Sequence, residues 1–199
     1  GVTLGLEVHA PGHIKDERVQ NWLNIKEKLG TKNMGLIPDF GIWETRPTPV
    51  IMEQCIRDGC SREYVELAEE KKALGWTWEQ MQDYLKGKGA NPGETDGVWR
   101  VFNVSYDNPE DLRLIMPHII SIHGKFYQMT EIPGCPGQYE DLAVNYKDPI
   151  HYLKAGGFDG YICSEYEGQR DQQDRGMEYL ADEVLEVRRH HEMLARLIE

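Results

Sequence analysis

Residues 34–39 read MGLIPD, a short apolar run that ends on a carboxylate, and this arrangement recurs along the chain. Similar runs are VTLGLEVH at 2–9, HIISIH at 118–123 and DGYICSE at 159–165. Each is rich in apolar and β-branched residues, which favours a strand. We therefore predict four strands. The polar residues near their carboxyl ends are Glu7, Asp39, His123 and Glu165.

The segments between these strands carry helical patterns. Residues 16–29 have an apolar stripe that stops at Gly30, and residues 148–156 form a helix before a Gly-Gly pair. A last helix is predicted from about residue 174 to residue 198. Strands that alternate with helices in this way are typical of a parallel α/β sheet.

A long, mostly helical connection at about 45–117 separates the second strand from the third. Within it, helices are predicted at 61–73 and at 77–87. Residues 87–97, GKGANPGETDG, are predicted to be a loop because glycine, proline and small polar residues dominate there. The connection is therefore an elaborated insertion between two strands.

The predicted fold class is α/β, of the TIM (β/α)8 barrel type. The spacing between Glu7 and Asp39 is close to the roughly 31 residues per unit of a barrel of about 250 residues. A closed barrel needs eight strands, and we predict four. We expect residues 1–199 to be a single domain that forms half of such a barrel. The missing half would come from the rest of the polypeptide or from another chain.

The composition is that of an acidic protein without a disulfide framework. The 199 residues carry a net charge of −12 at pH 7 and include four cysteines with no CxxC pair. An acidic surface repels phosphate backbones, so nucleic acid is not an expected partner. The thiols are expected to be reduced. No apolar run approaches membrane-spanning length, so we expect a cytoplasmic protein with no membrane partner.

The four strand-end residues have the chemistry of a divalent-metal site. Residues at the carboxyl ends of successive strands in a barrel converge on one mouth. Three carboxylates and one imidazole suit Mn²⁺, Mg²⁺ or Co²⁺ better than they suit structural zinc. A lone carboxylate at a strand end is more often structural, but four such ends in succession favour a metal. The predicted ligands are Glu7, Asp39, His123 and Glu165.

Such a site supports proton abstraction next to a sugar carbonyl. A divalent ion can hold a carbonyl and a neighbouring hydroxyl and stabilise the enediolate that forms. His9 shares a strand face with Glu7, so its imidazole is the predicted base. The alternative for His9 is a hydrogen bond to a ligand. Glu7 and Glu165 complete the predicted catalytic set.

Several residues that follow the ligands are candidates for substrate contact. His13 is also a second candidate for the base. A solvated loop or ordinary packing remains the alternative for each candidate. His190 and His191 are predicted to be surface or packing residues without a functional role. The predicted substrate-binding residues are His13, Lys125, Glu167, Arg170 and Trp43.

At these residues the chain resembles the xylose-isomerase-like TIM barrels, the sugar phosphate isomerases and epimerases. The resemblance implies that this chain is the strand-5 to strand-8 half of the barrel. It also implies one catalytic ion, Mn²⁺ by preference, with Mg²⁺, Co²⁺ or Zn²⁺ as alternatives. The four predicted ligands match the family's Glu, Asp, His and Glu. The resembling segments are LGLEVHAPGH, GLIPDFGIW, IISIHGKFYQM and GGFDGYICSEYEG.

The Glu-x-His at Glu7 and His9, with HGKFY and SEYEG, also resembles the catalytic subunit of C-glycoside deglycosidases. That resemblance implies cleavage of a 3-oxo-glycoside, with the histidine removing a proton beside the keto group, and a smaller β-rich partner subunit. The ketose 3-epimerase branch would have Glu at the place of His13 and Arg at the place of Met129. Both departures weaken an epimerase interpretation.

Three functions follow, in order of preference. The first is a divalent-metal-dependent carbohydrate isomerase or epimerase. The second is a C-glycoside deglycosidase catalytic subunit, a 3-oxo-glycoside lyase. The third is a non-catalytic half-barrel that binds or assembles. The sugar or glycoside substrate, the native metal and the oligomeric state stay open.

Overall fold

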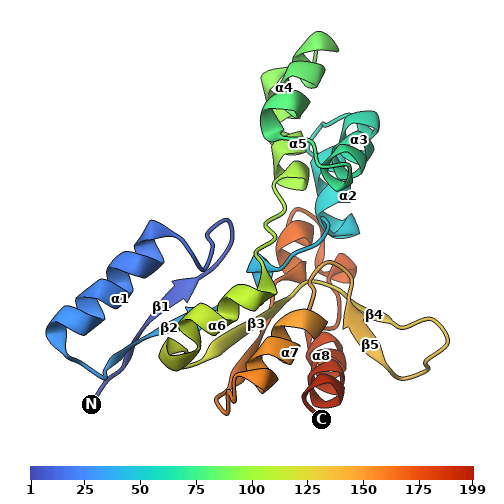
Figure 1. Cartoon of the computed structure of the whole chain (residues 1–199). Coiled ribbons are helices and arrows are strands. Elements are labelled where there is room, and N and C mark those ends of the chain that lie inside the picture. The colour runs from blue at the N-terminus through green and yellow to red at the C-terminus, as the bar shows by residue number, and fades with distance from the viewer. The chain divides into compact units, whose positions relative to one another are not determined.

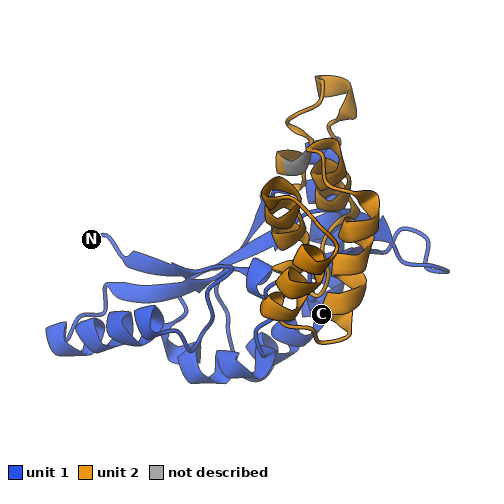
Figure 2. Cartoon of the chain, turned by 90° about the horizontal axis from the view of Figure 1, so that it is seen from above, with its two compact units in different colours: residues 1–44, 105–167, 182–199 blue, residues 45–104, 168–181 orange. Residues whose placement is uncertain are grey.

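The computed structural model describes residues 1–199 apart from residue 171, and the chain divides into two compact units (Figure 2). Unit 1 is assembled from residues 1–44, 105–167 and 182–199. Unit 2 comprises residues 45–104 and 168–181. Each unit has its own buried apolar cluster and is described by itself.

Unit 1 contains four parallel strands, each of which overlaps one of the four segments predicted as strands. They are β1 (Leu4–Val8), β2 (Met34–Pro38), β3 (Ile122–Phe126) and β6 (Ile162–Tyr166) (Figure 1). β1 pairs with β2, and β3 pairs with β6, each as a parallel ladder. The parallel bridges Leu36–Ile119 and Asp39–His123 join the two ladders. The strands therefore follow one another in the order β1-β2-β3-β6.

β3 starts later than the predicted strand at 118–123. Met116–His118 forms the short 3-10 helix η3, with Pro117 in its first turn. Because η3 includes the first predicted strand residue, the strand begins further along the chain, at Ile122. His123 consequently lies second in β3 rather than last. It lies opposite Asp39, because a parallel bridge between these two residues aligns the end of β2 with β3.

The helices of unit 1 cover the strands and a short hairpin. Helix α1 (Glu17–Leu29) ends at Gly30, whose φ of 58° is left-handed and suits glycine. The hairpin is antiparallel, with β4 (Met129–Glu131) and β5 (Tyr139–Asp141). The remaining elements are η1 (Phe40–Ile42), η2 (Pro109–Asp111), α6 (Leu112–Ile115), α7 (Lys147–Ala155) and α8 (Glu183–Ile198).

Helix α8 begins at Glu183, so the helix predicted from about residue 174 is wrong over its first part. Asp182 caps it by accepting a hydrogen bond from the Leu185 amide at 3.0 Å. Before the cap, Met177–Tyr179 forms the 3-10 helix η5, and Met177 is 81% exposed. The buried face of α8 carries Met193 and Leu194 together with two polar residues, Glu186 and His190.

Unit 2 is built from helices packed around an apolar core that includes Cys55 and Cys60. Its segments are α2 (Pro49–Arg57), α3 (Arg62–Ala73), α4 (Trp78–Gly87), α5 (Pro92–Phe102) and η4 (Gly168–Gln172), with η5. The predicted helices at 61–73 and 77–87 correspond to α3 and α4, and Thr77 forms a capping box with Gln80.

The loop predicted at 87–97 is wrong over its second half, because α5 begins at Pro92. Asn91 accepts from the Glu94 amide at 3.0 Å, and the Glu94 carboxylate accepts from the Asn91 amide at 2.9 Å. This capping box, with proline in the first turn, starts a helix despite the glycine-rich composition.

The architecture is therefore mixed α/β, about half helical, with small sheets. The strands of the described residues do not close into a barrel. Within the same residues, every helix is too short or too polar to cross a lipid bilayer.

Candidate metal centre

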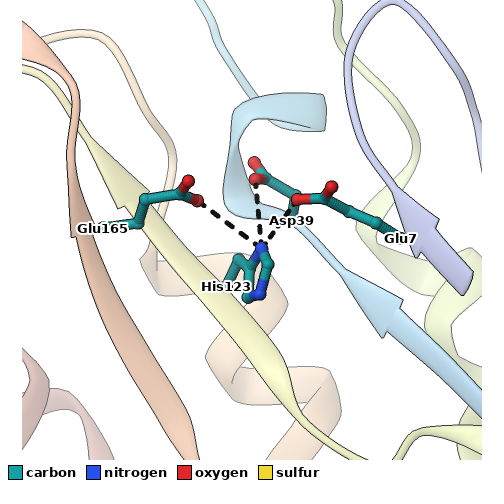
Figure 3. Close-up of side chains that lie close together, drawn as sticks. All are labelled: Glu7, Asp39, His123 and Glu165. Carbon is teal, nitrogen blue, oxygen red and sulfur yellow. Dashed lines mark hydrogen bonds and ion pairs between the residues drawn. The ribbon is translucent and has the colours of Figure 1, made fainter. Parts of the chain in front are cut away.

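Four predicted side chains meet at one end of the parallel strands of unit 1 (Figure 3). Glu7 comes from β1, His123 from β3 and Glu165 from β6, whereas Asp39 directly follows β2. One potential ligand atom from each of the four lies within 4.8 Å of all the others. The convergence arises because the strands are parallel and the bridge Asp39–His123 sets the end of β2 beside the first part of β3.

The imidazole of His123 lies at the centre of the group. Its Nδ1 is 2.7 Å from Oε1 of Glu7, 3.5 Å from Oε2 of Glu165 and 4.0 Å from Oδ2 of Asp39. The His123 side chain is 33% exposed, and those of Glu7 and Glu165 are each 39% exposed. The cluster is therefore open to solvent on the side of these three residues.

Asp39 is the buried member of the cluster, with none of its side chain exposed. Asp39 caps the N-terminus of η1, and its Oδ1 accepts a hydrogen bond from the amide of Gly41 at 2.6 Å. Burial raises the pKa of Asp39 from 3.8 to about 6, against the opposing attraction of Lys125. Oδ2 faces the other three ligands.

Lys125 lies beneath the carboxylates, and its side chain is 8% exposed. Its Nζ is 2.9 Å from Asp39 Oδ2, 3.6 Å from Glu167 Oε1 and 3.8 Å from Glu165 Oε2. Burial by itself would lower the pKa of Lys125, but the attraction of Asp39, Glu167 and Glu165 outweighs it and raises the pKa. This ammonium therefore neutralises part of the negative charge of the cluster.

The cluster offers carboxylate oxygens whose hydrogen-bonding capacity is not filled. Among the described residues, buried Glu165 Oε2 has no hydrogen-bond donor, and buried Asp39 Oδ2 has only the Lys125 ammonium, at 2.9 Å. Buried acceptors are normally satisfied. Carboxylates in excess over cations, with one imidazole nitrogen, form a donor set that fits one divalent ion such as Mn²⁺, Mg²⁺ or Co²⁺.

The predicted base lies one residue beyond β1. His9 is exposed, and its carbonyl accepts from the Gly12 amide at 2.9 Å. His13 is also exposed, and its amide donates to Asp16 Oδ2 at 2.8 Å in the turn before α1. Both imidazoles are accessible to a substrate from solvent, and their roles stay predictions.

The other predicted substrate contacts have different surroundings. Trp43 is fully buried and packs edge-on against Phe40 in the core of unit 1, which disfavours stacking on a sugar. Glu167 is buried beside Lys125. Arg170 is an exposed residue of η4, in unit 2. Contact of any of these residues with substrate stays a prediction.

One polar group beside the site was missed by the sequence reasoning. His190 of α8 is fully buried and forms hydrogen bonds with Ser164 and Tyr146. Strand alternation could have indicated part of this group, because Ser164 must face away from Glu165. The contact with α8 is long-range, and the local sequence carries no signal for it.

Comparison with known proteins relates the chain to one group of enzymes. No protein-family model matches it. The chain is 32% identical over 182 residues to a C-glycoside deglycosidase alpha subunit of Arthrobacter globiformis, covering 84% of this chain and 48% of that protein. It is 30% identical over 182 residues to a C-glycoside deglycosidase alpha subunit of Microbacterium trichothecenolyticum, with the same coverage of 84% and 48%.

A third relative is the 3'-dehydrocarminate deglycosidase alpha subunit of a Microbacterium species. It is 26% identical over 181 residues, which cover 84% of this chain and 50% of that protein. The chain thus spans about half the length of the curated relatives it matches. It is similar, over most of its own length, to alpha subunits of C-glycoside deglycosidases.

Proposed function

We propose that this chain is part of the catalytic α subunit of a metal-dependent C-glycoside deglycosidase, which releases the aglycone from a 3-oxo-glycoside. The observation that carries the proposal is the convergence of Glu7, Asp39, His123 and Glu165 within 4.8 Å. The names of the relatives supply the substrate class.

We propose further that residues 1–199 are a single domain equivalent to strands 5 to 8 of a TIM (β/α)8 barrel, with residues 45–117 as an elaborated connection. The strand order β1-β2-β3-β6 and the shared edge of the ligands support this proposal. The relatives are about twice as long as the matched region. The other strands would come from the rest of the polypeptide or from a partner chain.

Glu7, Asp39, His123 and Glu165 would hold one divalent ion, Mn²⁺ by preference. When bound, the ion supplies a Lewis acid that draws electron density from a sugar oxygen. Lys125 forms an ion pair with Asp39 and offsets part of the carboxylate charge. Asp39 has a fixed orientation, because the Gly41 amide holds its other oxygen.

His9 is the proposed base. Its imidazole would take the proton from the sugar carbon that lies between the keto carbon and the anomeric carbon. As the electron pair of that C–H bond becomes the new carbon–carbon double bond to the anomeric carbon, the bond from the anomeric carbon to the aglycone breaks. The electron pair of the broken bond goes to the aglycone carbon, which takes up a proton. The exposure of His9 beside β1 is compatible with this role.

An isomerase or epimerase would begin with the same proton abstraction, but the relatives found by comparison are all named deglycosidases. The departures at His13 and Met129 also disfavour the epimerase pattern. A non-catalytic half-barrel would have no use for buried carboxylate oxygens whose hydrogen-bonding capacity is not filled. The deglycosidase proposal is therefore preferred to both.

The test uses the natural polypeptide, purified with any chain that accompanies it. Its intact mass measures how long the polypeptide is, and elemental analysis measures the bound metal. We expect one divalent ion per chain and release of the aglycone from a 3-oxo-C-glycoside. Epimer formation from a keto-sugar, without aglycone release, would favour the isomerase. A metal-free, inactive preparation that Mn²⁺ does not restore would leave the half-barrel binding module.

A further inference from the structure

A buried histidine lies behind the strands that carry the metal ligands. His190, on α8, has 0% exposure, and its ring stacks on Phe126 of β3 with centroids 4.1 Å apart and planes 7° from parallel. Close packing against β3 depends on Gly124, because a Cβ there would lie 3.2 Å from Cε1 of His190 and 2.9 Å from Cγ2 of Ile162. The imidazole is thus held rigidly between the helix and the strands.

Both ring nitrogens of His190 have partners. Nδ1 lies 2.8 Å from Oγ of Ser164, and Nε2 lies 2.8 Å from the hydroxyl of Tyr146. The Tyr146 hydroxyl in turn donates to the carbonyl of Lys125 at 2.7 Å. A carbonyl can only accept, so Tyr146 must accept from Nε2–H of His190. Nδ1 is then the acceptor, and the Ser164 hydroxyl is its donor.

This hydrogen-bonded chain reaches the two strands beside the metal cluster. Ser164 directly precedes Glu165 on β6, and side chains alternate along a strand, so Ser164 faces α8 when Glu165 faces the cluster. On β3, Lys125 projects its ammonium to Asp39, whereas its carbonyl accepts from Tyr146. The same imidazole is therefore linked to β6 through the Ser164 side chain and to the backbone of β3 through Tyr146.

The Lys125 carbonyl needs such a donor. The next carbonyl, that of Phe126, accepts from the Glu167 amide at 2.9 Å and so points to the β6 side. Carbonyls alternate in direction along a strand, so the Lys125 carbonyl points to the opposite side, where β2 has already ended at Pro38. Tyr146 supplies the hydrogen bond that a longer β2 would otherwise provide.

We propose that His190 is a positioning residue of the metal centre. Its neutral imidazole, with Nε2 protonated, joins β6 to β3 from behind through Ser164 and Tyr146, and thereby fixes the separation of Glu165, Lys125 and His123. This inference rests on the proposed function, because it assumes that the four-residue cluster binds a cation. Burial, with a smaller contribution from His191, lowers the pKa of His190 to about 3, which agrees with a neutral ring.

The test measures Mn²⁺ affinity by titration calorimetry on the natural polypeptide and its variants, at a temperature where circular dichroism shows each to be folded. Replacing His190→Leu removes both hydrogen bonds, and we expect the Mn²⁺ Kd to rise about tenfold, the lower end of effects from outer-shell partners. His190→Gln can donate and accept along the same lines and should restore most of the affinity. Tyr146→Phe and Ser164→Ala should each raise the Kd by a smaller factor.

The matched control is Met193→Ala, one helical turn further along α8. Met193 is also buried, at 2% exposure, but its thioether side chain cannot donate a hydrogen bond to β3 or β6. This variant should lower the melting temperature and leave the Mn²⁺ Kd unchanged. A Kd that is unchanged in His190→Leu, Tyr146→Phe and Ser164→Ala overturns the proposal, as does an equal rise in Met193→Ala.

If His190→Leu does not fold, Tyr146→Phe and Ser164→Ala decide the question, because each removes one link and keeps the imidazole. The two proposals can fail separately. A wild-type polypeptide that binds no Mn²⁺ overturns the metal site and this inference with it. Tight wild-type binding with unaffected variants overturns only the role of His190. A nitrogen-15 NMR spectrum showing His190 protonated at Nδ1 instead of Nε2 would also contradict the assignment.

Discussion

Two buried aspartates of unit 1 have opposite surroundings. Asp141, at the end of β5, accepts four backbone hydrogen bonds: the amides of Ala143 and Val144 reach Oδ1 at 2.8 and 2.7 Å, and those of Tyr127 and Gln128 reach Oδ2 at 2.8 and 3.1 Å. Asp39, at the end of β2, has the Gly41 amide on Oδ1, while Oδ2 accepts no backbone amide and has only the Lys125 ammonium, at 2.9 Å.

The difference shows that burial by itself does not mark a functional carboxylate. Both residues are buried, and burial raises the pKa of each. At Asp141 the backbone amides satisfy the charge, so the residue joins the end of β3 to the loop after β5. At Asp39 one oxygen has a single donor, Lys125, and keeps the capacity to accept a further group. The open acceptor distinguishes the candidate ligand from the structural residue.

The same isosteric change at the two positions tests this contrast most strongly. Asp39→Asn replaces a charged ligand by a neutral amide, and we expect Mn²⁺ affinity to fall roughly a thousandfold, about 4 kcal/mol. The unfolding free energy of the metal-free protein should not fall at neutral pH, because the neutral amide avoids burying a carboxylate whose pKa burial raises. Titration calorimetry and urea unfolding measure the two quantities. Unaltered Mn²⁺ affinity would exclude Asp39 as a ligand.

At Asp141 the expected result is reversed. In Asp141→Asn an amide nitrogen replaces one carboxylate oxygen, so two buried backbone amides lose their acceptor. We expect the unfolding free energy to fall by about 3 kcal/mol, with Mn²⁺ affinity unchanged at temperatures where the variant stays folded. Urea unfolding provides the measurement. A variant as stable as the wild type would mean that these four bonds contribute little.

The pH dependence of the unfolding free energy tests the surroundings of Asp39 without a substitution. Burial raises the pKa of Asp39 from 3.8 to about 6, so between these values the folded protein binds more protons than the unfolded chain. The contribution of Asp39 is therefore fully present below about pH 4 and is lost as the pH rises through 6, by about 3 kcal/mol in metal-free protein. Urea unfolding between pH 5 and 7 follows it.

Asp39→Asn should remove this pH-dependent contribution to stability. Plots of unfolding free energy against pH for the wild type and the variant should therefore differ in slope between pH 5 and 7. Parallel curves would show that Asp39 does not titrate there. Saturating Mn²⁺ should oppose the loss in the wild type, because the metal binds the ionised carboxylate.

The smallest expected effect concerns the glycine that holds Asp39. A Cβ on Gly41 would lie 2.9 Å from Asp39 Oδ1 and 3.2 Å from Cδ of Lys125. Gly41→Ala should therefore displace the carboxylate and weaken Mn²⁺ binding by about tenfold, or about 1.4 kcal/mol. The control is Gly87→Ala at the end of α4, where a Cβ meets nothing within 4 Å. Equal Mn²⁺ affinity in both variants would contradict the close packing around Asp39.

The sequence alone predicts the framework of the site well. Polar residues that end apolar runs indicated both the parallel strands and the side chains that meet at their ends. Alternation and register are local properties, so they carry Glu7, Asp39, His123 and Glu165 to one edge without knowledge of distant contacts. The roles assigned to His9, His13 and Arg170 stay predictions.

Features that depend on long-range packing were not predictable in the same way. Composition suggested a loop at 87–97, but the reciprocal bonds of Asn91 and Glu94 start α5 inside it. Sequence did not indicate that the side chains of Lys125 and Trp43 are buried, and their contact with substrate stays a prediction. The link from His190 to β3 and β6 joins residues far apart in sequence, and no local pattern records it.

The contact between β2 and β3 couples metal binding to the stability of the fold. Glu7 and Asp39 come from one ladder, and His123 and Glu165 come from the other. An ion shared by all four would cross-link the two ladders where they are joined by the bridges Leu36–Ile119 and Asp39–His123. Removing the ion would loosen the contact between β2 and β3 first. Amide hydrogens around Asp39 and Ile120 would then exchange faster, while those within each ladder stay protected.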